Sequence, residues 1–221
     1  MLKACGLGRR KPGGEDWLLR GVCIAVRPGD RLALTGPSGT GKTVLLRALA
    51  LLDPHDEGSI EWQGRSLSGE AIPAYRKQVV YLHQRPALFE GTVEDNLKFP
   101  FTLKSHRGKL FDRERVVCIL ETLKRDATFL EKSSRDLSGG EAQIVTLIRC
   151  LQLDPAMLLL DEPTASLDNA TAEAAEELVY RWQLEASGAR SFIWVSHDIE
   201  QSKRMSGRRL QMHQGGIQPD E

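Results

Sequence analysis

The sequence predicts an α/β fold with a mostly parallel sheet and an inserted helical lobe. Strand-like runs alternate with helix-like segments over most of the chain, which is the pattern of parallel strands joined by helical crossovers. The runs Val79–Leu82 and Met157–Leu160 are almost continuously apolar, as expected of strands covered on both faces. Residues 85–136 contain no strong strand signal. We therefore predict one domain in two lobes: a catalytic core lobe of 1–84 and 154–221, and a helical lobe of 85–153.

The individual elements follow from local patterns. Each predicted strand is a short run of strand formers bounded by Gly, Pro or polar residues. The predicted strands are Leu2–Leu7, Val22–Val26, Arg31–Thr35, Ser59–Trp62, Gln78–Leu82, Met157–Leu160, Ser191–Val195 and Arg208–His213. Each predicted helix has helical spacing of apolar residues or good helix formers. The predicted helices are Val44–Ala50, Thr92–Leu97, Arg113–Leu123, Asp126–Lys132, Ser138–Leu153, Asn169–Glu185 and Asp198–Arg204. The polar, glycine-rich residues Arg9–Asp16 predict a loop.

Composition narrows the class of protein. The chain has 221 residues, a hydrophobic fraction of 41% and a charged fraction of 27%, all ordinary for a soluble globular protein. Its net charge is zero, from 30 basic and 30 acidic residues, which argues against a nucleic-acid binder that relies on a positive field. The four cysteines are far apart and form no C-x-x-C pair, so reduced thiols are expected and a zinc site is not. Since no apolar run approaches a membrane span, any membrane role requires a partner that crosses the bilayer.

A glycine-rich loop lies between a predicted strand and a predicted helix. Residues 36–43 fit the pattern G-x-x-x-x-G-K-[ST]. Glycines let backbone N–H groups face a phosphate, and the N-terminus of the next helix adds partial positive charge. Lys42 would reach the β- and γ-phosphates of a nucleotide, and the Thr43 hydroxyl would bind Mg²⁺. The alternative is a glycine-rich turn with a surface lysine, but the flanking elements favour a nucleotide site. The predicted phosphate-binding residues are Gly36, Pro37, Ser38, Gly39, Thr40, Gly41, Lys42 and Thr43.

Two carboxylates follow the apolar strand Met157–Leu160. Ligands of parallel α/β sheets bind at the carboxyl ends of the strands, where these two residues stand. We predict that Asp161 holds Mg²⁺, directly or through water, and that Glu162 orients or deprotonates the attacking water. The alternative is a strand that simply ends in solvated acids, which the nearby phosphate loop disfavours.

The stretch Leu137–Glu141, Leu-Ser-Gly-Gly-Glu, begins a predicted helix. Ser138 and Glu141 are expected to form a capping box. That local role does not explain Gly139 and Gly140, because each glycine in a first helical turn costs about 1 kcal/mol relative to Ala. Consecutive glycines at the start of a helix allow close approach of the backbone to an anion.

This stretch, placed between the phosphate loop and the paired carboxylates, resembles the signature of ATP-binding-cassette (ABC) ATPases. The resemblance spans nearly the whole chain. It implies a P-loop NTPase (RecA-like) core with a mostly parallel sheet, an N-terminal antiparallel β portion and an inserted α-helical lobe. It also implies that two copies close head to tail around two Mg-ATP molecules. Ser138, Gly139 and Gly140 of one copy would then contact the ATP held by the other.

Three further residues match the family in order. Gln84, after a strand, resembles the Q-loop glutamine that senses Mg²⁺ and links the lobes. Asp168, in Ser-Leu-Asp, resembles the D-loop aspartate, and His197 resembles the switch histidine that contacts the γ-phosphate. The resemblance therefore implies that Lys42, Glu162 and His197 carry ATP hydrolysis, with Mg²⁺ bound by Thr43, Gln84 and Asp161. Taken singly, Gln84 is also a typical polar strand end, Asp168 a typical helix cap and His197 a typical exposed histidine.

A block after Gln84 narrows the resemblance. Residues Leu88–Leu97 resemble the region of exporter-type cassettes that faces the coupling helices of the membrane subunit. Together with Phe99–Phe101 and Leu147–Leu151, the block is similar to the stand-alone ATPase of a bacterial iron-export transporter. The chain contains no metal-ligand cluster that would support iron by its own chemistry. An amphipathic helix that packs within the helical lobe is the alternative interpretation of the block.

The sequence departs from the family in two places. Members usually carry an aromatic residue near the end of the first strand, where it stacks on adenine, but residues 8–13 contain none. Trp17 is the nearest aromatic residue and is better explained by core packing beside Leu18 and Leu19, so an arginine plane is another way to hold adenine. Ile144 stands where the family most often has Arg, which removes an expected salt bridge of the helical lobe.

We therefore expect a cytoplasmic ATPase subunit, peripheral on the cytoplasmic face of the inner or plasma membrane. Its expected ligands are ATP and Mg²⁺. Its expected partners are a second copy of itself and an integral-membrane permease, with no nucleic acid and no direct membrane contact. Two alternatives stay open: an ABC-type ATPase that couples dimerisation to a non-transport partner, and a P-loop regulatory module with negligible turnover.

Overall fold

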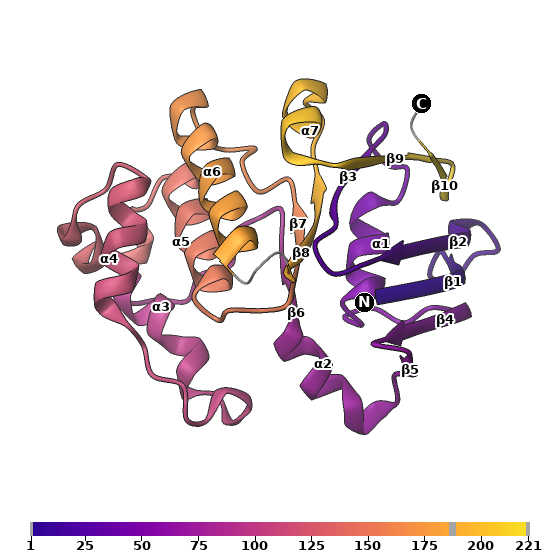
Figure 1. Cartoon of the computed structure of the whole chain (residues 1–221), viewed down its shortest axis with the longest axis horizontal. Coiled ribbons are helices and arrows are strands. Elements are labelled where there is room, and N and C mark those ends of the chain that lie inside the picture. The colour runs from indigo at the N-terminus through magenta and orange to yellow at the C-terminus, as the bar shows by residue number, and fades with distance from the viewer. Residues whose placement is uncertain (1, 186–188, 220–221) are drawn as a thin grey trace.

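The computed structural model describes residues 2–185 and 189–219, in which two β-sheets organise the chain (Figure 1). The larger sheet has six strands in the order β10-β9-β3-β8-β7-β6, and only β10 runs antiparallel to its neighbour. The smaller sheet is antiparallel, with the order β2-β1-β4-β5. The larger sheet comprises β3 (Arg31–Thr35), β6 (Val79–Leu82), β7 (Met157–Asp161), β8 (Ser191–Val195), β9 (Arg208–His213) and β10 (Gly216–Pro219). The smaller sheet comprises β1 (Leu2–Arg10), β2 (Trp17–Val26), β4 (Glu57–Trp62) and β5 (Arg65–Ser66). The predicted parallel core and antiparallel N-terminal portion are thus confirmed.

The helices divide between the two sides of the parallel sheet. Figure 1 shows α3, α4, α5 and α6 gathered on one side, and α1 with the antiparallel sheet on the other. The helices are α1 (Lys42–Leu49), α2 (Ile72–Gln78), α3 (Val93–Thr102), α4 (Arg113–Thr122), α5 (Gly139–Leu151), α6 (Asn169–Glu185) and α7 (Ile199–Met205). Short 3₁₀ turns are η1 (Gly69–Ala71), η2 (Lys104–His106), η3 (Ala127–Glu131) and η4 (Ser134–Asp136). No helix in the described ranges is both long and apolar enough to cross a bilayer.

Strand β7 separates two hydrophobic cores. Its side chains alternate between faces, so Leu158 and Leu160 pack with the helices α3–α6, whereas Met157 and Leu159 pack with α1 and the antiparallel sheet. All four are buried, which explains why the run is apolar without alternation. Packing on both faces therefore holds β7 in place, and this also fixes the position of the functional groups at its carboxyl end.

Several elements differ from the sequence-based expectation. The predicted loop Arg9–Asp16 is wrong at its start, because Arg9 and Arg10 continue β1 and pair with Leu19 and Trp17 of β2. The strand pairing overrides their polarity, and β2 accordingly begins at Trp17 instead of Val22. Gln78 ends α2, a helix that was not predicted, instead of beginning β6. Strand β10 was not predicted either.

In the region between β6 and β7 the element types also shift. Helix α3 runs five residues beyond the predicted end at Leu97, and Pro100 lies in its last turn. A capping box formed by Thr92 and Asp95 fixes its start. The predicted helix over Asp126–Lys132 is a 3₁₀ turn that begins at an Asp126 cap. The division into lobes at 84/85 and 153/154 stays a prediction.

A charged cluster braces the helix that follows the phosphate loop. Arg47 donates two hydrogen bonds of 2.7 Å to the carboxylate of Asp53, and Arg9 of β1 lies 2.6 Å from the same carboxylate. The hydrogen bond from Arg47, aided by Arg9, lowers the pKa of Asp53 below its usual value. Asp53, which the sequence marks only as a helix end, thus ties α1 to the antiparallel sheet.

Candidate nucleotide site

The phosphate loop connects β3 to α1. Gly36 has φ +134°, and a Cβ at this position would lie 2.3 Å from the backbone oxygen of Met212 in β9, so only glycine fits. The Lys42 amine is buried and donates to the carbonyl oxygens of Gly36 at 2.7 Å and Pro37 at 2.9 Å. Burial lowers the pKa of Lys42, while the charges of Glu162 and Asp161 act in the opposite direction. The lysine is therefore held inside the loop, within the electrostatic reach of both acids.

Asp161 is the buried last residue of β7. The Tyr81 hydroxyl of the neighbouring strand β6 donates to its Oδ2 at 2.9 Å. Its Oδ1 is buried and has no hydrogen-bond partner among the described residues. Burial raises the pKa of Asp161, and hydrogen bonding to Thr43 and Tyr81 lowers it in part. An unpaired buried carboxylate oxygen beside a threonine hydroxyl is the donor set that Mg²⁺ prefers, so these residues fit that cation.

Glu162 lies at the centre of a three-residue cluster. Gln84 Nε2 donates to its Oε2 at 2.8 Å, and His197 Nε2 lies 2.8 Å from its Oε1. The three residues come from chain segments that follow β6, β7 and β8, whose parallel register brings their carboxyl ends to one edge. Glu162 itself has φ +49°, an unusual conformation for a non-glycine residue. The structure therefore joins three residues that sequence matching selected separately.

A pocket of about 400 Å³ connects one member of this cluster to the phosphate loop. Gly36 and Pro37 of the loop and His197 of the cluster all line it. Lys42 interacts electrostatically with Glu162 and Asp161, so the loop lysine lies near both acids. The phosphate loop, the paired acids and the residues corresponding to the Q-loop and switch positions thus form one site.

The signature stretch lies at the start of α5. The predicted capping box is present: Glu141 N donates to Ser138 Oγ at 3.2 Å and Ser138 N donates to Glu141 Oε2 at 2.8 Å. Lys132 donates to the Glu141 carboxylate at 2.8 and 3.0 Å and, together with the Ser138 N–H, lowers the pKa of Glu141. No hydrogen bond or ion pair in the described ranges joins residues 138–140 to the phosphate loop of the same chain.

The two glycines of this stretch have different surroundings. A Cβ on Gly140 would lie 2.8 Å from the backbone oxygen of Ser166, which is too close for a side chain. A Cβ on Gly139 would meet nothing nearer than 3.9 Å. Close packing against the 166–168 turn therefore explains Gly140 without an anion, whereas Gly139 has no such structural reason and lies exposed with Ser138.

Asp168 acts as a helix cap in this structure. Thr171 N donates to its Oδ1 at 3.0 Å and Thr171 Oγ1 donates to its Oδ2 at 2.7 Å. These bonds lower the pKa of Asp168. The capping alternative given by the sequence thus describes what the side chain does here, and contact of Asp168 with nucleotide stays a prediction.

Gln143 is a residue that sequence reasoning missed. It is 1% exposed on α5; its Nε2 donates to the carbonyl oxygen of Glu162 at 2.8 Å, and its Oε1 accepts from Ser166 N at 2.9 Å. One amide therefore joins the signature helix to the backbone on both sides of the turn after β7. Tyr81, the donor to Asp161, was missed as well; for both, the only available signal is a polar residue in an otherwise apolar stripe.

The adenine end of the site has no exposed aromatic residue at 8–13. Trp17 is partly buried, and the Arg10 guanidinium covers its ring at 4.5 Å from the centroid. Arg10 and Trp17 are register partners in β1 and β2. The Trp17 ring lies over Gly8 of β1, where an added Cβ would be 2.8 Å from it, and Arg10 presents a planar cation over the ring. Trp17 belongs to neither hydrophobic core, so the expected core packing beside Leu18 and Leu19 stays a prediction.

Taken together, the parallel sheet, the phosphate loop after β3 and the acids after β7 define a P-loop NTPase. The chain belongs to the ABC transporter family, whose model, described as "ABC transporter", matches residues 19–165. Members of this family bind and hydrolyse ATP. By its membership, the chain is the ATP-binding subunit of an ABC transporter.

Named relatives include exporters and importers. The chain is 35% identical over 206 residues to the "Probable iron export ATP-binding protein FetA" of Escherichia coli (strain K12), covering 93% of this chain and 89% of that protein. It is 37% identical over 205 residues to "Protein STAR1" of Oryza sativa subsp. japonica, and 36% identical over 212 residues to "Fe(3+) ions import ATP-binding protein FbpC 3" of Rhodococcus jostii (strain RHA1). These matches cover 93% and 95% of this chain but only 58% and 59% of those two proteins.

Solved structures agree with the fold. The dimeric ABC transporter cassette MJ0796 superposes with a TM-score of 0.88 at 26% identity, covering 100% of this chain and 98% of that one. A dimeric post-hydrolysis state of MJ0796, bound to ADP and Pi, gives a TM-score of 0.86 at 25% identity with the same coverage. Both neighbours are dimers of cassettes.

Proposed function

We propose that this chain binds and hydrolyses ATP to power transport through a separate membrane permease. The observation that carries the proposal is the Glu162 carboxylate, held at 2.8 Å by both Gln84 and His197 beside the phosphate loop. A carboxylate fixed by two partners, one of them beside the pocket at Gly36, is suited to orient a water toward a γ-phosphate.

The other residues have complementary roles in this proposal. Lys42, already bonded to the loop carbonyls, would neutralise charge that develops on the transferred phosphoryl group. Mg²⁺ would be held by Thr43, Asp161 and Gln84, with the unpaired Oδ1 of Asp161 as its carboxylate ligand. When bound, the cation would act as a Lewis acid and stabilise negative charge on the phosphates. His197 and Gln84 would keep Glu162 in one orientation.

A second copy would complete the site. Ser138 and Gly139 are exposed and bond nothing in the phosphate loop of their own chain. The solved neighbours are dimeric, which supports a head-to-tail pair in which 138–140 of one copy contact ATP on the other. This arrangement gives the exposed, unhindered Gly139 a function that its own chain does not supply.

Coupling to a permease is proposed along α3 and the segment that precedes it. Phe89 and Phe99 are 37% and 45% exposed, and their rings lie 4.9 Å apart. Leu103, 43% exposed at the end of the same helix, extends this apolar surface. The rings fall in and beside the block 88–97 that resembles exporter cassettes, so we propose that a permease helix docks here and that the direction is export. Iron is the proposed cargo by similarity to FetA alone. Because the relatives also include importers, the direction of transport and the cargo need separate tests.

The nucleotide half is tested with Glu162→Gln. This variant should bind Mg-ATP, fail to turn over and elute as a dimer on size exclusion, because the carboxylate is lost while the phosphate contacts remain. Glu121→Gln, on the exposed face of α4, is the matched control and should hydrolyse ATP normally. Lys42→Ala should lose ATP binding or turnover. A Glu162→Gln chain that stays monomeric with Mg-ATP would count against the two-copy site.

The transport half is tested by co-purification. A Phe89→Ser, Phe99→Ser double variant should keep its ATPase activity in solution and lose a co-purifying polytopic membrane protein. Leu184→Ser removes an equally exposed apolar side chain, 50% exposed on α6, and should retain that partner. Retention of the partner by the double variant would remove this surface as the docking site, and identification of the partner would establish the cargo experimentally.

A further inference from the structure

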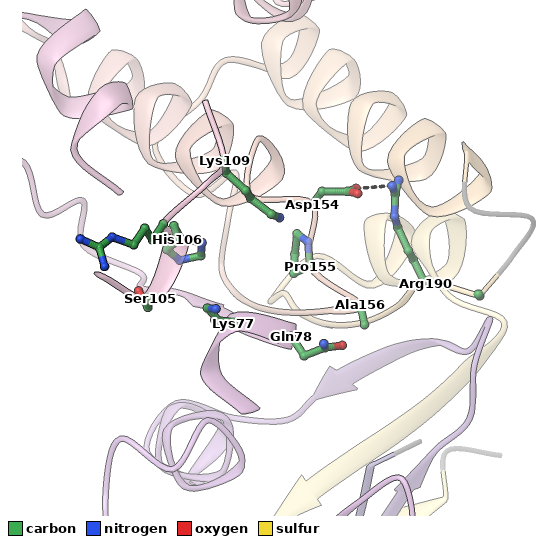
Figure 2. A pocket seen from close by; sticks show the side chains of 11 residues that line it. Lys77, Gln78, Ser105, His106, Lys109, Asp154, Pro155, Ala156 and Arg190 are labelled. Atoms are coloured by element: carbon green, nitrogen blue, oxygen red, sulfur yellow. Dashed lines mark hydrogen bonds and ion pairs between the residues drawn. The ribbon is translucent and has the colours of Figure 1, made fainter. Parts of the chain in front are cut away.

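A second pocket lies at the opposite edge of the parallel sheet from the phosphate loop. Its volume is about 470 Å³, within the range of small-molecule sites. The lining comes from the residues immediately before β6, β7 and β8 and from the segment 105–109 after α3 (Figure 2). Because β3 and α1 carry the phosphate loop at the other end of the strands, this pocket is separate from the nucleotide site.

The charged groups of this pocket do not balance. Among the described residues that line it, the single carboxylate is Asp154, which is ion-paired with Arg190. Arg190 also lies 3.3 Å from Glu185, which is outside the pocket. The remaining ionisable lining residues are basic: Lys77 from the end of α2, and His106, Arg107 and Lys109 from the 105–109 segment.

The cations have few protein partners. The side chains of Lys77 and Arg107 make no hydrogen bond or ion pair within 2–185 and 189–219. Lys109 donates at 2.7 Å to the carbonyl oxygen of Leu153, a neutral acceptor. With Arg190 compensated, Lys77, Arg107 and Lys109 line the pocket without a counter-charge from the described chain.

The surroundings of His106 indicate that the electrostatic potential in the pocket is positive. Figure 2 shows His106 on the same side of the pocket as Lys77 and Ser105, and the Lys109 side chain extending toward Asp154. The imidazole is partly buried, and its pKa is lowered first by that burial and then by Lys109 and Lys77. The positive charges from two separate elements therefore act on the same point.

The uncharged lining sets the kind of ligand. Ser105 and Gln78 offer neutral hydrogen-bonding groups, and Pro155 and Ala156 offer a small apolar wall. Three cations exceed what a carboxylate monoanion would need, whereas a phosphate group carries nearly two charges at neutral pH. Lysine ammonium groups bind phosphate as point charges and do not require the planar geometry of a carboxylate.

We propose that this pocket binds a phosphate monoester, the phosphate being held by Lys77, Arg107 and Lys109 and the remainder of the molecule lying against Pro155 and Ala156. The ligand would join the end of α2 to the segment after α3, so it would restrain how these two parts of the chain move relative to each other. The site is independent of the ATP-hydrolysis proposal above.

The experiment is an NMR titration of the histidine ring signals with inorganic phosphate. His106→Asn assigns the signal, and His197, which lines the phosphate-loop pocket, reports separately on phosphate bound there. Bound phosphate should raise the pKa of His106 by about one pH unit, since an opposite charge replaces net positive surroundings. The Lys77→Gln, Arg107→Gln double variant should weaken this effect at least tenfold. Lys104→Gln removes a charge from the same turn, but its side chain does not line the pocket, so it should behave as wild type.

A parallel arm separates a soluble ligand from a lipid headgroup. Co-sedimentation with phosphatidylcholine vesicles, with and without phosphatidic acid, tests the phosphate monoester of a lipid. A phosphate effect on His106, or phosphatidic-acid binding that requires Lys77 and Arg107, supports the proposal with the corresponding source. Absence of both overturns it, as does an effect that the double variant leaves undiminished. Lys109→Gln serves as a second variant should the double variant fail to fold.

Discussion

Replacing Gln143 with Leu removes the amide that joins α5 to the turn carrying Glu162. The side chain is 1% exposed, donates to Glu162 O at 2.8 Å and accepts from Ser166 N at 2.9 Å. Leucine preserves the approximate volume but makes neither hydrogen bond. The Ser166 N–H therefore loses its partner, whereas the Glu162 carbonyl loses one of two hydrogen bonds and keeps the one from Ala165 N at 3.2 Å.

The expected loss of stability follows mainly from the Ser166 N–H. A buried polar group left without a partner costs about 1–3 kcal/mol. We therefore expect Gln143→Leu to lower the free energy of unfolding by about 1–3 kcal/mol. That is a substantial part of the roughly 5–15 kcal/mol that holds a typical domain folded.

Gln152→Leu is the matched control at the other end of the same helix. Gln152 is also buried and donates at 2.6 Å to the carbonyl oxygen of Leu97, while its Oε1 is buried without a partner in the described part of the chain. Leucine here removes one hydrogen bond to a carbonyl of helix α3, and it also removes one oxygen that already lacked a partner. We therefore expect a cost of about 1 kcal/mol or less.

The assay combines urea unfolding, followed by circular dichroism, with steady-state ATPase measurements. Gln143→Leu should lower kcat as well as stability, because the backbone of Glu162, at φ +49°, loses the shorter of the two hydrogen bonds to its carbonyl. Gln152→Leu should leave kcat unchanged. Equal costs for the two variants, or a Gln143→Leu chain with normal stability, would refute this account of the turn.

Three further outcomes follow from the same structure. Asp53→Asn should lower the free energy of unfolding by about 1–3 kcal/mol at pH 7, measured by urea unfolding. Arg47 holds the pKa of Asp53 in the folded chain below its unfolded value of about 4. The difference in stability between wild type and variant should therefore shrink as the pH falls below about 4. Gly140→Ala should lower the melting temperature, since its Cβ would lie 2.8 Å from a backbone oxygen, whereas Gly139→Ala should be tolerated; the reverse order would contradict the packing explanation. Trp17→Ala should leave ATP affinity, measured by calorimetry, largely unchanged because the Arg10 guanidinium covers the ring; a large drop would show that the ring stacks on adenine.

The parts of the site that the sequence predicts are those with a local cause. The phosphate loop needs its glycines and lysine at fixed spacing, so its position could be read directly. Asp161 and Glu162 could be placed because an apolar strand ends there, and parallel strands present their carboxyl ends together. The meeting of Gln84 and His197 on Glu162 follows from the same edge, although their 2.8 Å contacts do not.

The parts that the sequence does not predict depend on contacts between distant segments. Gln143 is one polar residue on a buried helix face, and nothing near it in the chain indicates that its partners are 19 and 23 residues away. Arg9 and Arg10 look like loop residues until the partner strand pairs with them. The phosphate pocket proposed here is assembled from four segments, none of which is distinctive alone.

The alternation of β7 between two cores also constrains which mutations the site can survive. A single-residue insertion within Met157–Leu160 would exchange the faces of every side chain beyond it, moving Leu159 from one core to the other. Asp161 would then point away from Tyr81, and the position beside the phosphate loop would pass to a leucine. An insertion or deletion in this strand should therefore damage both the cores and the site more than a point substitution does. Engineered insertions should be placed outside β7.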